Sequence, residues 1–205
     1  MKQPHHIINA TIIRSLVIQY RTILIILIGS ISATSAVRAQ NLVLNGGFET
    51  GSFSSWTLTG NTGSTSVGGE FAHTGLFGTK LGPVGSDGVL TQSLATTPGA
   101  SYDLSFWLQN TNGNPNDFTV SFGGVTVFNL LNSPGFSYTQ YTFTDLAATG
   151  GSTLMQFSYR QDPGSWNLDD VSVTASATPE PSTGLLLTMG AVGLFLRRKR
   201  HARNA

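Results

Sequence analysis

An alternation of apolar and polar side chains runs through the middle of the chain, and this pattern limits the fold more than any other feature. It is clearest in residues 101–109, where every second position from Tyr102 to Leu108 is apolar and Trp107 is among the residues between them. Successive side chains of an extended strand point to opposite faces, so this spacing predicts a strand with one buried face. A helix would instead place its apolar residues at intervals of three and four.

Similar runs recur between residues 41 and 177, with turn-forming residues in the gaps. They lie at residues 88–94, 118–122, 125–129, 137–145, 152–160 and 167–174. The pair Gly123-Gly124 separates two of these runs, which is typical of a tight hairpin. Because no stretch between the runs has a helical period, we predict an all-β domain. Strands of this length and spacing favour an antiparallel β-sandwich or jelly roll.

The charges are distributed unevenly along the chain, which excludes several classes of function. Between Gln40 and Thr178 nine acidic residues accompany only two basic ones, Lys80 and Arg160, so this stretch carries a net charge of −7. The other nine basic residues lie towards the two ends. An acidic body repels phosphate backbones, so nucleic acid is not expected as a partner. The chain contains no cysteine, which excludes disulfides, thiolate nucleophiles and cysteine-ligated metals.

The first 39 residues have the order of a secretory signal peptide. A basic start precedes the apolar run at residues 23–28, and small or modest side chains at residues 37 and 39 fit a signal peptidase site. We therefore predict that residues 1–39 form a signal helix that signal peptidase removes. The alternative is an uncleaved membrane anchor, but Arg14 and Arg21 interrupt the apolar stretch. A charge at mid-membrane costs roughly 2.5–3.5 kcal/mol on insertion scales, which disfavours the anchor.

The last 28 residues, 178–205, combine three parts in a fixed order. These are the motif Pro179, Glu180 and Pro181, an apolar stretch at residues 184–196, and the basic cluster Arg197, Arg198, Lys199 and Arg200. The two prolines hold the motif extended. The apolar stretch would form a short hydrophobic helix of roughly 20 Å, against a hydrocarbon core of about 30 Å. Basic residues stay on the cytoplasmic side of a membrane, so the domain would face outward.

This order resembles the PEP-CTERM sorting signal of Gram-negative bacteria, although Thr178 stands where that family often has Val. The resemblance implies that an exosortase recognises the tail and removes it near the Pro-Glu-Pro motif, after a transient attachment to the inner membrane. It also implies an exported protein of the cell envelope or extracellular matrix, connected with exopolysaccharide or biofilm. A plain single-span anchor is the alternative, and it too leaves the domain facing outward.

Both ends of the predicted domain, residues 40–177, carry short motifs. Residues 41–49 read Asn-Leu-Val-Leu-Asn-Gly-Gly-Phe-Glu, with Trp56 shortly after, and residues 168–173 read Leu-Asp-Asp-Val-Ser-Val. This pair resembles the beginning and the end of galactose-binding-like β-sandwiches, including several families of carbohydrate-binding modules. The resemblance implies a sandwich that extends over the whole domain, and it leaves the ligand open.

In such relatives the opening Glu and the closing Asp often help to bind a structural calcium ion, which here implies Glu49 and Asp169, with Asp170 as the alternative. Carboxylates are suitable calcium ligands. Asp169 shares strand parity with Val171, so we expect it to face inward, where a carboxylate needs a metal or a partner. Arg160 is the expected partner if no metal is bound. The other interpretation is a turn-forming Asn-Gly and an ordinary pair of solvated aspartates.

Exposed aromatic and polar side chains are the candidates for binding a sugar. By strand parity Trp107 and Gln109 lie opposite the apolar face of their strand, and Tyr141, Tyr159 and Arg160 would complete a binding surface. Aromatic side chains offer a large apolar face for a sugar ring, and the polar groups can hydrogen-bond its hydroxyls. The alternative is that a second layer of the protein covers Trp107.

No catalytic constellation emerges from the sequence. A glycosidase needs two carboxylates that flank the scissile bond, and no motif selects such a pair from the nine acids. We therefore expect a non-catalytic module that associates with polysaccharide. The alternatives are a structural surface or biofilm protein without a specific glycan ligand and, third, a small secreted hydrolase. An exposed aromatic strip would favour the module, whereas an exposed apolar patch or open edge strand would favour the structural protein.

Overall fold

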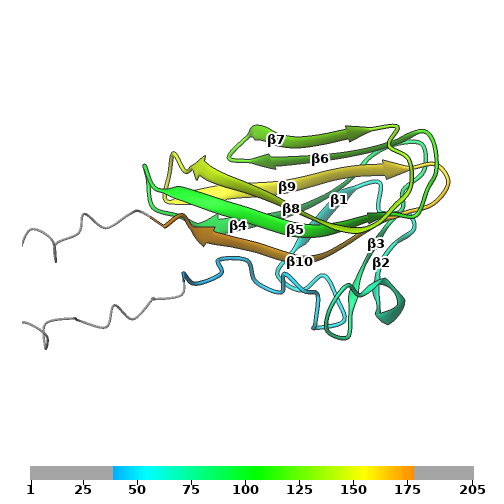
Figure 1. Cartoon of the computed structure of the whole chain (residues 1–205), viewed down its shortest axis with the longest axis horizontal. Helices are drawn as coiled ribbons and strands as arrows, with labels where there is room; N and C mark the ends of the chain where they lie inside the picture. Colours follow the sequence, from blue (N-terminus) through cyan, green and yellow to red (C-terminus); the bar gives the residue numbers. More distant parts are fainter. Residues whose placement is uncertain (1–38, 178–205) are drawn as a thin grey trace, which may run out of the picture. The chain divides into compact units, whose positions relative to one another are not determined.

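The computed structural model describes residues 39–177, which form two antiparallel β-sheets packed against each other (Figure 1). Sheet A has the strand order β1 (Thr57–Gly60), β4 (Gly88–Ala95), β9 (Ser152–Gln161), β6 (Asn116–Phe122) and β7 (Val125–Leu131). Sheet B has the order β2 (Thr65–Gly68), β3 (Gly78–Leu81), β10 (Trp166–Ala175), β5 (Ser101–Asn110) and β8 (Phe136–Ala147). The prediction of an all-β antiparallel sandwich is confirmed.

The remaining element of the described residues is a single 3-10 turn, η1 (Gly69–Phe71), between β2 and β3. The predicted signal helix falls on residues 1–38 and the predicted sorting tail on residues 178–205, which lie outside the described part of the chain. Within residues 39–177 no helix is long and apolar enough to cross a membrane.

The alternating runs of the sequence correspond to β4 to β10. In β5, for example, the side chains from Tyr102 to Leu108 at even positions are buried, and those between them are half-buried. The pattern did not reveal β1, β2 and β3. Each of these strands has four residues, which is too short for alternation to stand out from the surrounding loops.

The predicted hairpin joins β6 and β7 through Gly123 and Gly124. The φ angles of these glycines are 60° and 83°. A two-residue turn of this type needs positive φ at both central positions, which glycine adopts without steric cost. The turn thereby sets the pairing of β6 with β7 at the edge of sheet A.

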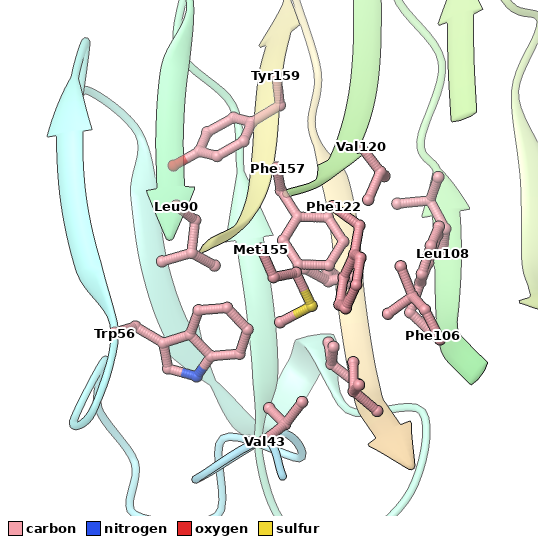
Figure 2. Packing of buried hydrophobic residues seen from close by; sticks show 14 of the residues in the cluster. Val43, Trp56, Leu90, Phe106, Leu108, Val120, Phe122, Met155, Phe157 and Tyr159 are labelled. Atoms are coloured by element: carbon pink, nitrogen blue, oxygen red, sulfur yellow. The ribbon is translucent and has the colours of Figure 1, made fainter. Parts of the chain in front are cut away.

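Aromatic side chains from both sheets fill the space between them (Figure 2). Phe106 of sheet B meets Phe157 of sheet A at a centroid distance of 5.5 Å with the rings perpendicular. Both side chains are fully buried. Edge-to-face contacts of this kind are favourable for aromatic rings. The core therefore joins the two sheets into one unit.

The two ends of the described chain are bonded into the sandwich. The N–H of Leu42 donates to the carbonyl of Val173 at 2.8 Å, and the N–H of Ser176 donates to the carbonyl of Ser101 at 2.9 Å. A fragment of residues 39–177 thus contains all the strands and the core that the structure describes, with both of its ends held. This fragment is suited to solution experiments.

Candidate functional site

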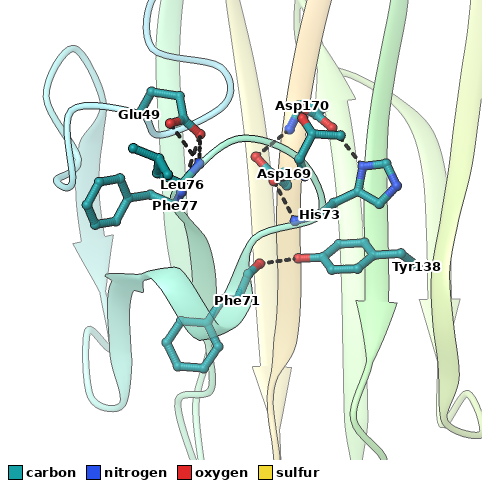
Figure 3. Close-up of polar contacts among 9 residues, drawn as sticks. Glu49, Phe71, His73, Leu76, Phe77, Tyr138, Asp169 and Asp170 are labelled. Atoms are coloured by element: carbon teal, nitrogen blue, oxygen red, sulfur yellow. Dashed lines mark hydrogen bonds and ion pairs between the residues drawn. The ribbon is translucent and has the colours of Figure 1, made fainter.

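The loop that joins η1 to β3, residues 72–77, is held by three carboxylates from distant parts of the chain (Figure 3). Asp169 Oδ2 accepts the backbone N–H groups of His73 at 2.7 Å and Thr74 at 3.2 Å, and Asp169 Oδ1 accepts the N–H of Asp170 at 2.7 Å. The Asp169 side chain is fully buried. Burial raises the pKa of this carboxyl to about 6, although the three hydrogen bonds act in the opposite direction.

Glu49 holds the other end of the same loop. Its Oε2 accepts the N–H of Leu76 at 3.0 Å, and its Oε1 accepts the N–H of Phe77 at 3.3 Å. Gly75 lies directly under this carboxylate, with φ of +68°, and a Cβ at that position would lie 2.1 Å from Glu49 Oε1. Only glycine therefore allows the loop to approach Glu49 so closely.

Asp170 binds the side chains of the loop rather than its backbone. Its Oδ2 lies 2.7 Å from His73 Nδ1, and its Oδ1 accepts the hydroxyl of Thr74 at 2.7 Å. The His73 ring in turn stacks on Trp107, with centroids 3.8 Å apart and an interplanar angle of 18°. Tyr138 lies on the same cluster, with its ring centroid 5.0 Å from that of His73 (Figure 3). The loop thus lies over the outer face of sheet B.

Tyr138 adds a further bond between β8 and this covering segment. Its hydroxyl donates to the backbone carbonyl of Phe71 at 2.5 Å. Burial raises the pKa of Tyr138, and the negative charges of Asp169 and Asp170 raise it further. The hydroxyl therefore stays protonated and can donate this bond over the whole physiological pH range.

A β-bulge explains why Asp169 lies under the loop and not in the core. The pairing of β10 with β5 shifts by one residue between Asp169 and Ser172, and Asp170 has a φ of 51°. Asp169 is directly opposite Trp107, and such partners in an antiparallel pair share one face. The predicted inward orientation with Val171 is therefore wrong, because the extra residue reverses the parity between the two positions.

The carboxylates that were predicted to bind calcium fit that ion in ligand chemistry. Glu49, Asp169 and Asp170 meet around one loop, and calcium prefers such oxygen ligands. A cation would also compensate the charge of Asp169, which burial destabilises. Among residues 39–177, however, no group of three or more His, Cys, Asp or Glu side chains is arranged as a metal site. Calcium would therefore take its remaining ligands from backbone carbonyls and water.

The structure does not bring the five predicted sugar-binding residues together. Trp107 and Gln109 lie on the outer face of β5 in sheet B, and Tyr141 is half-buried against core aromatics on β8. Tyr159 is wrong as a surface residue, because it is fully buried on the core side of β9, and burial raises its pKa to about 12. Arg160 follows it in the strand and lies on the outer face of sheet A.

The outer face of sheet A carries hydroxyl and amide side chains in register across all five strands. The strand pairing aligns Thr57, Thr91, Gln156, Ser121 and Thr126 in one row, and Thr59, Val89, Ser158, Thr119 and Asn129 in a second row. Neighbouring strands are about 4.8 Å apart, so each row extends over ~19 Å. We call these two rows the polar rows.

The two outer faces differ in how far they are covered. On β9, the central strand of sheet A, the outward side chains Gln156, Ser158 and Arg160 are all half-buried and none is fully buried. On β10, the central strand of sheet B, the side chains of Asn167 and Asp169 are buried. The polar rows therefore remain accessible, whereas sheet B is partly covered by its own loop.

Charged residues gather beside the second polar row, further along the central strands β9 and β6. Arg160 donates from Nε to Asp162 Oδ2 at 2.9 Å, and its Nη2 contacts the same oxygen. Asp117 is the strand partner of Arg160 on β6. Burial raises the pKa of Asp117, and the negative charge of Asp87 adds to this effect. The predicted pairing of Arg160 with Asp169 is wrong, because Arg160 lies on the opposite sheet and pairs with Asp162.

The fold is that of a carbohydrate-binding β-sandwich module. A family profile described as "Carbohydrate binding domain" matches residues 40–166, which is more than half of the chain. The chain therefore belongs to this carbohydrate-binding family. A second profile, described as "PEP-CTERM protein-sorting motif", matches residues 177–200. Together these matches identify an exported protein with a polysaccharide-binding domain and a sorting signal at its C-terminal end.

Three solved structures illustrate how widely this fold occurs. TmCBM61, solved with β-1,4-galactotriose, is 22% identical, with a TM-score of 0.56 over 67% of this chain and 100% of that chain. The enzymatically active domain of tailspike protein 4 from bacteriophage CBA120 is 21% identical, with a TM-score of 0.51 over 66% and 21%. The CBM22-1 and GH10 modules of Clostridium thermocellum xylanase 10B, complexed with xylohexaose, are 15% identical, with a TM-score of 0.50 over 68% and 29%. These similarities concern the fold, and no curated protein sequence matches the chain.

Proposed function

We propose that the domain binds polysaccharide through the polar rows on the outer face of sheet A. The observation that carries this proposal is the register of hydroxyl and amide side chains across five strands, on the less covered of the two faces. The first row is made of such side chains throughout, and the second is interrupted only by Val89. Hydroxyl and amide groups both donate and accept hydrogen bonds, so they match the hydroxyls of a sugar chain. A length of ~19 Å gives room for several sugars of an extended chain.

Alanine substitutions on matched positions of the two sheets test this proposal. The fragment 39–177 is applied to a panel of polysaccharides that includes β-1,4-galactan and xylan, and affinity is measured for each glycan retained. Gln156→Ala and Ser158→Ala are expected to weaken binding by about five-fold each, because each removes hydrogen bonds worth about 1 kcal/mol. Gln140→Ala and Thr142→Ala are the controls, since these exposed side chains lie on β8 of sheet B. Equal effects of the two pairs would contradict the proposal.

Trp107 and Gln109 remain the predicted alternative contact, on the other sheet. The stacking of His73 occupies one side of the Trp107 ring, which argues against a sugar platform there. Trp107→Ala is therefore expected to loosen the loop at residues 72–77 and to leave glycan affinity nearly unchanged. A loss of affinity larger than that of Gln156→Ala would move the binding site to sheet B.

We also propose that the domain has no catalytic activity of its own. The matched family is a carbohydrate-binding one, and binding modules act without cleaving their ligand. Of the carboxylates near the polar rows, Asp117 and Asp162 lie around Arg160, and Asp87 accepts the hydroxyl of Ser158. The test is an assay for new reducing ends after prolonged incubation with each retained glycan. Release above that of a heat-denatured sample would contradict this part of the proposal and would favour the small hydrolase.

A structural role through self-association is the second candidate, favoured by one strand. β7 is an edge strand of sheet A, and it contains neither charged residues nor proline. Val125 and Leu131 at its ends are 66% and 72% exposed. Native proteins usually protect edge strands with charges, prolines or bulges, because an open edge can pair with another chain. Of these features β7 has only the irregularity in its pairing with β6, opposite Val120 and Ser121.

Calcium at the carboxylates around the loop is a further proposal. Glu49, Asp169 and Asp170 would hold the ion, which would fix the loop and neutralise the buried charge. Addition of calcium to the chelator-treated fragment is expected to raise its melting temperature, and Asp169→Asn is expected to abolish the increase. An unchanged melting temperature of the wild type would show that hydrogen bonds alone hold the loop.

We propose, finally, that the chain matures in two cleavage steps, one near each end of the described residues. Signal peptidase would cleave after Ala39, and an exosortase would cleave near Pro179, Glu180 and Pro181 once the tail is in the inner membrane. The match to the sorting profile supports the second step. Mass spectrometry of the protein purified from its native envelope gives both termini, and an intact tail ending in residue 205 would favour the permanent anchor.

A further inference from the structure

The domain offers very few positive charges to a ligand. Within residues 39–177 the basic side chains are Lys80 and Arg160. Lys80 belongs to β3, on the sheet opposite the polar rows. Arg160 lies beside the rows, but its guanidinium is already bonded to Asp162. An anionic ligand on sheet A would therefore meet no cation that is not already neutralised within the described part of the chain.

Negative charge surrounds this single cation. Asp117 is opposite Arg160 on β6, and Asp87 lies close enough to raise the pKa of Asp117. Asp87 also accepts the hydroxyl of Ser158 at 3.1 Å, which places its carboxylate directly at the second polar row. Three carboxylates and one guanidinium leave this end of the face with an excess of negative charge. The whole stretch of residues 41–177 carries a net charge of −7, which adds to the local field.

The side chains of the polar rows themselves are all uncharged. Nine of the ten are Ser, Thr, Asn or Gln, and the tenth is Val89. Such groups bind hydroxyls, but they do not neutralise the charge of a carboxylate or a sulfate that loses its hydration on binding. An anionic glycan would be repelled by the carboxylates beside the polar rows, and this repulsion is strongest at low salt.

We infer that the polysaccharide accepted by sheet A is uncharged, and that glycans rich in uronate, sulfate or phosphate are excluded by Asp87, Asp117 and Asp162. This inference rests on the proposed function and specifies the substrate class of the same face. Sheet A would thus distinguish neutral from acidic glycans by their charge rather than by their shape.

Comparison of neutral and acidic glycans tests the inference. Immobilised β-1,4-galactan, xylan, polygalacturonate and alginate are offered to the fragment 39–177 at low and at physiological salt. The fragment is expected to bind a neutral glycan with little salt dependence and to bind neither polyanion. The double variant Asp87→Asn with Asp117→Asn is expected to gain measurable affinity for the polyanions at low salt. Glu70→Gln with Asp145→Asn is the control, because it removes the same charge from exposed positions away from sheet A.

The possible results separate the inference from the function on which it depends. Wild-type binding to a polyanion as strong as to any neutral glycan would overturn the inference and leave the proposed function standing. An equal gain in the double variant and in its control would also overturn it, since the effect would then be one of total charge. Binding to none of the glycans by a folded fragment would overturn the proposed function, and the inference with it.

Discussion

Asp169 is an acidic side chain without exposed surface, and it accepts hydrogen bonds from three backbone N–H groups. The sequence pattern identified it as a buried carboxylate of interest but placed it on the wrong side of sheet B. The reason is the single extra residue at the bulge, with Asp170 at positive φ. The buried apolar side chains change from even positions, Trp166 and Leu168, to odd ones, Val171 and Val173, and a parity counted from Val171 alone misses this shift. Similarly, nothing in the sequence indicated that His73 stacks on Trp107.

The raised pKa of Asp169 predicts how stability depends on pH. In the folded domain this carboxyl has a pKa of about 6, against an ordinary value of 3.8. Its protonated form therefore stabilises the fold below about pH 4, and this contribution is lost as the pH rises through 6. A shift of about two units corresponds to about 3 kcal/mol. The difference in unfolding free energy between wild type and Asp169→Asn should fall by roughly this amount between about pH 4 and pH 7.

The measurement is urea unfolding of both proteins across this pH range in the presence of a chelator. The substitution keeps the size of the side chain, so the pH-independent cost of altered hydrogen bonds cancels in the trend. A difference that stays constant with pH would contradict the assignment of the raised pKa to Asp169. Repeating the series with calcium is informative too, because a bound cation favours the ionised carboxylate and should remove the decline.

At the scale of the elements, the long strands were predictable from the sequence and the short ones were not. β5 and β9 have ten residues each, enough for the alternation between a buried and an outward face to be unambiguous. β1 to β3 have four residues each, and their pairing determines them more than their own pattern does: β1 pairs with β4, β3 with β10, and β2 with β3. The polar rows were missed for a related reason. Ser and Thr at alternate positions of a single strand are typical of any solvated face, and only the pairing of the strands shows that they form continuous rows.

The β6–β7 hairpin should depend on the backbone freedom of its turn. A Cβ on Gly124 would meet no atom within 4 Å, so the effect of Gly124→Ala comes from its φ of +83° alone. An L-residue in this region costs about 1–2 kcal/mol, and we expect the unfolding free energy to fall by that amount. Gly150→Ala is the matched control, because that glycine is not among those with positive φ and its nearest contact would be 3.6 Å. Equal stabilities of the two variants in chemical denaturation would contradict a strained turn.

The open edge at β7 should allow weak association between copies of the domain. Sedimentation of the fragment 39–177 at rising concentration is expected to show a monomer in equilibrium with larger species. Asn129→Lys adds a charge in the middle of β7, at an exposed position, and should shift the equilibrium to the monomer. Thr62→Lys adds the same charge to an exposed loop position and should have a smaller effect. A wild type that stays monomeric, or two variants that behave alike, would contradict self-association through β7.

At the scale of the whole molecule, one core supports two outer faces that differ in how far they are covered. Sheet B is partly covered by the loop at residues 72–77, which three carboxylates hold in place. Tyr138 adds a bond to the preceding residue, Phe71. Sheet A keeps its outer face accessible and carries the polar rows. The sequence predicted the sandwich, the polysaccharide-binding class and the sorting signal. Of its predicted sugar contacts, Trp107 and Gln109 lie on the face that the loop partly covers, and the assignment of the ligand to sheet A instead is a proposal still to be tested. Which face a long loop covers depends on tertiary contacts that no local pattern encodes.

The most direct test of this division is to map the glycan on the folded domain by NMR. The isotope-labelled fragment 39–177 is titrated with an oligosaccharide of a retained neutral glycan, and amide chemical shifts are followed. We predict that the largest changes lie on β4, β9 and β6, around Thr91, Gln156 and Ser158, and that residues 72–77 change little. Changes centred instead on Trp107 and the loop at residues 72–77 would contradict the assignment of polysaccharide binding to sheet A.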